Sequence, residues 1–66
     1  MGLHRDLVLR RWAVIIRFSH SATSPFPSET RTYFVEAYDA EAAATRIRSY
    51  FEQEGFHVHR VEANYG

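Results

Sequence analysis

The stretch that decides the fold is residues 31–62, which consists of RTYFVEAY (31–38), DAEAAATRIRSYFEQEG (39–55) and FHVHRVE (56–62). The first and last segments are short and rich in aromatic and β-branched residues, which is typical of strands, and the middle one carries apolar residues at helical spacing. Another strand-like run, from Leu7 to Phe18, precedes them. We therefore expect an α+β protein with the order ββαβ, in which one helix packs on one face of a three-stranded antiparallel sheet.

The connections between these segments predict the strand order. The first two strands form a hairpin, and a right-handed crossover through the helix places the third strand on the free side of the first. The expected order is 2-1-3, with the first strand central. At this length residues 1–66 form a single domain, and we expect residues 1–6 and 64–66 to fray at its ends.

Helix signals and apolar alternation identify the expected core. Asp39 is a suitable N-cap because its carboxylate can accept from the free amides of the first turn, and Gly55 follows the expected last helical residue, Glu54. The residues expected to face the core are Trp12, Val14, Ile16 and Phe18, then Val35 and Ala37, and in the helix Ala40, Ala43, Ile47, Tyr50 and Phe51.

The last strand contains a break in its alternation. Val58 and Val61 are an odd number of residues apart and cannot both face the helix in a regular strand. An extra residue on one strand would restore the phase, so we expect a β-bulge near His59–Arg60. Until its position is known, either face of this strand could be the buried one.

Composition excludes several classes of protein. Eight basic residues, all arginine, balance eight acidic ones, which argues against the strongly basic footprint of most nucleic-acid-binding domains. There is no cysteine, so disulfides are excluded, as in a cytosolic protein. No apolar run reaches membrane-spanning length, and no signal peptide is evident. We expect a cytoplasmic protein without a bound cofactor.

The face of the sheet turned away from the helix is the main candidate for function. The residues expected on it are Ile15, Arg17, Phe34, Tyr38, His57 and His59. A contiguous apolar patch, here Ile15, Phe34 and Tyr38, usually marks an interface. The alternative is that the N-terminal segment folds over this face. On the first interpretation the protein is a small non-enzymatic interaction module that binds itself, as a homodimer or higher form, or another protein through this face or a sheet edge.

The loop at residues 19–30, SHSATSPFPSET, is a second candidate. It is longer than an ordinary hairpin loop, and such loops are often functional or disordered. Phe26 stands between Pro25 and Pro27. Either Phe26 is presented on a stiff backbone as an interface anchor, or it folds back over the edge of the core.

The residues of the sheet also admit two other kinds of binding site. Arg17, Phe34, Tyr38 and His57 are residue types of a stacking platform for single-stranded nucleic acid. Separately, the third strand starts where the first one ends, so His20, His57 and His59 could meet as a zinc site. No serine or histidine is placed by a motif as nucleophile beside a base, so we expect no enzyme.

One segment resembles a known group of proteins. The matching residues are Val35-Glu36-Ala37, Asp39, Glu41, Ala43, Gly55, Val58, Val61 and Glu62, and with the arginine-only basic residues they are similar to small ββαβ accessory proteins of actinobacterial phages. The resemblance covers about half of the chain. It implies an accessory protein that modulates a host or defence component or packs on itself, and it assigns no functional residue.

Overall fold

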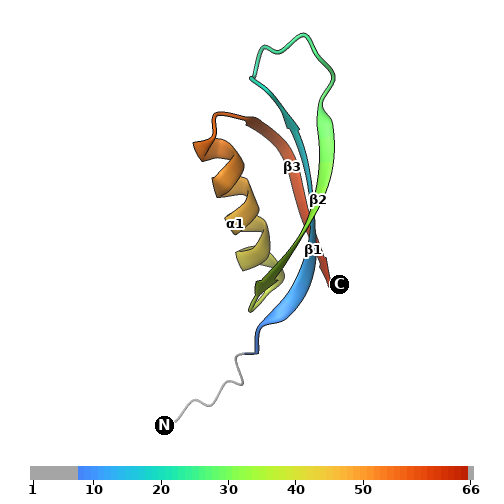
Figure 1. Ribbon diagram of the computed structural model, residues 1–66, viewed down its shortest axis with the longest axis vertical. Helices are drawn as coiled ribbons and strands as arrows, with labels where there is room; N and C mark the ends of the chain where they lie inside the picture. Colours follow the sequence, from blue (N-terminus) through green and yellow to red (C-terminus); the bar gives the residue numbers. More distant parts are fainter. Residues whose placement is uncertain (1–7, 66) are drawn as a thin grey trace.

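The computed structural model describes residues 8–65 and confirms the ββαβ order. The elements are β1 (Arg10–Ser19), β2 (Glu29–Ala37), α1 (Ala40–Gln53) and β3 (His57–Tyr65). The sheet order is β2-β1-β3, and β1 runs antiparallel to both neighbours, as predicted. Figure 1 shows α1 lying along one face of the curved sheet. The expectations for residues 1–6, for Leu7 and for Gly66 lie outside the described residues.

The core forms between β1 and α1, as the alternation predicted. Val14, Ile16 and Phe18 are fully buried. The Phe18 ring centroid lies 4.6 Å from that of Phe51 and 5.2 Å from that of Phe56, in tilted and edge-on arrangements that aromatic pairs prefer. The remaining buried apolar residues are Ala37, Ala43, Ile47 and Phe51.

Both ends of α1 are capped as expected. The Asp39 carboxylate accepts a hydrogen bond of 2.7 Å from the Ala42 amide. At the other end Gly55 has a φ of +91°, and the Phe56 amide donates back to the Phe51 carbonyl at 3.0 Å. This is the bond that closes a Schellman cap. The helix ends at Gln53, one residue earlier than expected.

The predicted bulge is present in β3. Arg17 of β1 pairs with Arg60, but the next residue, Phe18, pairs with Val58, so His59 is the extra residue. The insertion returns Val61 to the same side as Val58, and both pack against the core. The buried side of β3 is therefore the one that carries Val58 and Val61.

The strands differ from the expected ones at their ends. β1 begins at Arg10, after an exposed Val8 and Leu9, and β2 runs from Glu29 to Ala37 instead of over residues 31–38. β3 extends to Tyr65, although residues 64 and 65 were expected to fray. The long-range contacts of Tyr65 explain the extension. Its ring lies 5.5 Å from that of Trp12, and its hydroxyl accepts a hydrogen bond of 2.6 Å from Arg10.

Tyr50 is the one residue of the predicted helical stripe that is exposed, with 58% of its surface open to solvent. The helix lies closer to β3 than to β2, and the flank that carries Tyr50 is left with little beneath it.

No helix within residues 8–65 has the length and apolar character needed to cross a membrane.

Candidate functional site

The uncovered face is the side of the sheet turned away from α1. Figure 1 shows α1 on one side of the sheet and no helix or strand of residues 8–65 on the other. Strand alternation and the two registers place on it Arg11, Ala13, Ile15, Arg17 and Ser19 of β1, Thr30, Thr32, Phe34 and Glu36 of β2, and His57, Arg60, Glu62 and Asn64 of β3.

The apolar part of the uncovered face is smaller than the sequence predicted. It consists of Ala13, Ile15 and Phe34, and charged or polar side chains surround it. Phe34 is 58% exposed and lies opposite the small Ala13. The Arg11 guanidinium carbon lies 4.6 Å from the centre of the Phe34 ring, a cation–π arrangement. A nucleic-acid base would have to displace this arginine to stack on that face of the ring.

The prediction for Tyr38 was wrong. It was expected beside Phe34, but it lies beyond the last residue of β2 and lines a hollow with Arg10, Trp12 and Tyr65, whose positions belong to the helix-facing side. The strand pleat ends at Ala37, where the chain turns to start α1, and alternation no longer sets the direction of the side chain.

Arg17 lies on the uncovered face as predicted, at the end nearest the loop. Its Nε donates a hydrogen bond of 2.8 Å to Ser28 Oγ. Arg17 pairs across the sheet with Arg60, whose guanidinium is 3.1 Å from the Glu62 carboxylate. Charges of both signs therefore flank Ile15, which suits a surface that is complementary to itself more than one that binds a polyanion.

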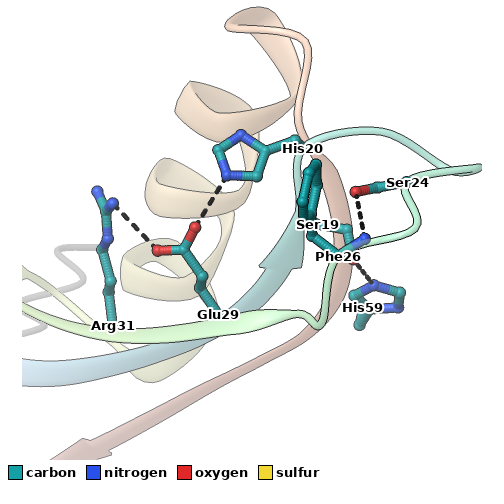
Figure 2. A network of polar contacts seen from close by, with 7 residues as sticks. All are labelled: Ser19, His20, Ser24, Phe26, Glu29, Arg31 and His59. Carbon is teal, nitrogen blue, oxygen red and sulfur yellow. Dashed lines mark hydrogen bonds and ion pairs between the residues drawn. The ribbon is translucent and has the colours of Figure 1, made fainter.

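The loop from residue 20 to residue 28 presents Phe26 to solvent. Phe26 is 69% exposed, so it does not fold back over the edge of the core, and its role as an interface anchor stays a prediction. Its amide donates to Ser24 Oγ at 3.2 Å, so the turn is held locally (Figure 2). The loop projects past the end of the sheet (Figure 1) and borders an open hollow of about 790 Å³.

A small polar network lies at the root of this loop on the helix side. Glu29 accepts from His20 at 2.9 Å and from Arg31 at 3.4 Å, and Figure 2 shows its carboxylate between the two. Tyr33, and to a lesser degree the Glu29 carboxylate, raise the pKa of the Arg31 guanidinium above its ordinary value. The network closes the loop where it enters β2.

The structure does not bring the three candidate histidines together. His57 and His59 have ring centroids 4.9 Å apart, while His20 turns to Glu29. Within residues 8–65 no group of three or more possible ligands is arranged to hold a metal ion.

His59 instead contacts Ser19, which was not among the predicted site residues. Its Nε2 lies 2.6 Å from Oγ of Ser19, which is only 8% exposed (Figure 2). The bulge directs His59 onto Ser19, and the broken alternation at Val58 and Val61 was its only signal in the sequence. A serine beside a histidine is part of some nucleophilic sites, but Ser19 is largely covered here.

Both outer strands have a free edge. β2 and β3 have nine residues each and pair only with β1 among the described residues.

No protein-family model, curated protein or solved structure matches the chain. The surfaces of the fold are therefore the basis for inferring its function.

Proposed function

We propose that the chain is a small, non-enzymatic protein-interaction module that associates with itself through the uncovered face or a sheet edge. The observation that carries the proposal is the half-covered sheet: one helix covers one face, while Ile15 and Phe34 lie on the other with Phe34 mostly exposed. Apolar side chains grouped on an open sheet face are typical of an interface.

Size and charge support a second copy as the partner. A chain of 66 residues without cysteine has only its small core to stabilise it, about 3–5 kcal/mol for domains of this size, and association is a common supplement. Arg11 and Arg17 alternate with Glu36 and Glu62 on the uncovered face. A surface that carries both signs can meet its own copy with opposite charges in register.

The proposal extends to the role of the assembled module. The resemblance of residues 35–62 to phage accessory proteins supports a role in modulating a host or defence component in the cytoplasm. The exposed Phe26 loop is the surface we assign to that second protein, because an aromatic side chain held on a stiff backbone loses little entropy on binding.

The test is the variant Phe34→Glu, measured by light scattering over a range of protein concentrations. The wild-type chain should show a mass above that of the monomer, and the variant should show a monomer mass with an unchanged circular dichroism spectrum. Losing an interface aromatic costs about 2 kcal/mol per site. Two sites per dimer correspond to a dissociation constant weaker by roughly a thousandfold.

Thr45→Glu is the matched control, because it adds the same charge at an exposed position on the outer side of α1. It should keep the wild-type mass. The proposal fails if the wild-type chain is monomeric at every concentration, or if Phe34→Glu and Thr45→Glu behave alike. Monomers that bind single-stranded DNA with an affinity falling steeply with salt would favour a nucleic-acid-binding module instead.

A further inference from the structure

The two free edges of the sheet differ in how well they are protected. β3 carries the bulge at His59 and the ion pair between Arg60 and Glu62, and α1 lies closest to it. Bulges, charges and a covering helix are the usual means by which proteins block pairing at an edge. β3 is therefore a poor strand for further pairing.

β2 is less protected: it has no bulge, its charged residues Glu29, Arg31 and Glu36 lie towards its ends, and α1 reaches it through the contact of Arg46 with the Glu36 carbonyl. Its sequence ETRTYFVEA has no proline, glycine or lysine, and its pairing with β1 runs without a break from Glu29 to Ala37. The four central residues, 32–35, are uncharged and belong to the β-branched and aromatic types that favour strands. A long regular edge of this kind is a template for another strand.

The helix leaves apolar side chains of β2 partly uncovered beside this edge. Tyr33 and Val35 face the helix but are only half-buried. Arg46 of α1 donates a hydrogen bond of 3.0 Å to the Glu36 carbonyl, which shows that this flank of the helix faces β2. Tyr50 follows Arg46 by one helical turn and is exposed on the same flank. A strand added to β2 would cover Tyr33 and lie beneath Tyr50.

Resting on the proposed self-association, we propose that the occupant of this edge is β2 of a second copy, paired antiparallel with Tyr33 opposite Tyr33. This register pairs all nine residues of β2 and places Thr30 opposite Glu36 and Thr32 opposite Phe34. Opposed residues share a face in an antiparallel sheet, so the two uncovered faces become one. The two Phe34 rings become diagonal neighbours within reach of each other.

The charges favour this register. Glu36 lies beside Arg11 of its own chain, and in the pair it also faces Thr30 of the second copy, whose hydroxyl can donate to the carboxylate. Thr30 pairs in turn with Arg17 of that copy. Each Glu36 is thus set in a row between two arginines, and no two like charges are directly opposed. Sliding the strands so that Thr30 faces Thr32 would oppose Arg31 to itself.

The experiment is disulfide trapping in the full chain, which has no cysteine of its own. Thr30→Cys and Glu36→Cys are exposed positions that leave the aromatic residues intact. Mixed under mild oxidation, the two variants should form a covalent heterodimer, because opposed residues lie within disulfide range. Either variant alone should not crosslink, because its two cysteines would be roughly 20 Å apart along the strands. Thr45→Cys mixed with Glu36→Cys gives the background from random collision.

The outcomes separate the register from the association itself. A heterodimer yield several-fold above the Thr45→Cys background supports the proposal. A wild-type chain that is dimeric by light scattering but gives only background yield overturns pairing through β2 and leaves self-association standing. A higher yield from Thr32→Cys with Glu36→Cys, or from Thr30→Cys with Phe34→Cys, overturns the register. A monomeric wild-type chain overturns both proposals.

Discussion

The hydrogen bond between Ser19 and His59 predicts an asymmetric response to removing its two partners. Ser19 is 8% exposed, whereas His59 lies at the surface. The distance between Ser19 Oγ and His59 Nε2 is 2.6 Å. His59→Ala leaves a buried hydroxyl without a partner, while Ser19→Ala leaves an imidazole that water can reach. The first variant should therefore lose more stability than the second.

The magnitudes follow from burial. An unpaired buried polar group costs about 1–3 kcal/mol, so His59→Ala should lower the free energy of unfolding by that amount. Ser19→Ala removes the buried group together with its hydrogen bond and should cost at most about 1 kcal/mol. In the double variant no unpaired hydroxyl remains, and its loss should be close to that of Ser19→Ala alone. The coupling free energy between the two sites is then as large as the effect of His59→Ala, about 1–3 kcal/mol.

Urea unfolding measures this cycle through Trp12, the single tryptophan of the chain. Its indole donates a hydrogen bond of 3.0 Å to the Ala37 carbonyl, so its fluorescence should change when the sheet separates. For so small a domain the denaturant slope is about 1 kcal/mol per M, and His59→Ala should lower the midpoint by about 1–3 M. All four proteins are compared at one concentration, because association stabilises the folded state. If the two single effects simply add, the hydrogen bond does not stabilise the fold as argued.

Two further predictions concern the turns. Gly55→Ala should lower the free energy of unfolding by about 1 kcal/mol, because alanine is strained at a φ of +91°. The added Cβ meets no atom within 4 Å, so backbone strain is the only cost. An unchanged urea midpoint would contradict this. Phe26→Ala should change the free energy of unfolding by less than about 0.5 kcal/mol, because the ring is 69% exposed, and a loss above 1 kcal/mol would show that the ring packs on the domain.

Local patterns predicted much of the fold because they are direct consequences of backbone geometry. Alternation from Trp12 to Phe18 identified the buried side of β1, and Asp39 with Gly55 marked the ends of the helix to within a residue. The odd spacing of Val58 and Val61 located the bulge. In each case the signal is a pattern among residues a few positions apart in the sequence, which backbone geometry alone relates to structure.

Long-range packing decided the features that the sequence did not predict. Tyr65 extends β3 because it reaches Arg10 and Trp12, more than fifty residues away along the chain. Tyr50 is exposed because the helix lies towards β3, a position that the helical pattern does not encode. Tyr38 left the predicted interface because the strand ended one residue before it. The uncovered face was located correctly, but its apolar area was overestimated by this one side chain.

The lateral position of the helix connects stability with association. Because α1 lies towards β3, Tyr33 and Val35 of β2 stay half-buried, and β2 is held by β1 alone among the described strands. A helix centred over the sheet would bury these two residues within one chain and would leave no apolar surface beside the β2 edge. In its present position the chain gives up part of its own apolar burial and keeps an edge whose completion by a second β2 would restore it. A small domain with no disulfide gains most from such an arrangement, because each Å² buried at the edge adds to a core that is already near the lower limit for independent folding.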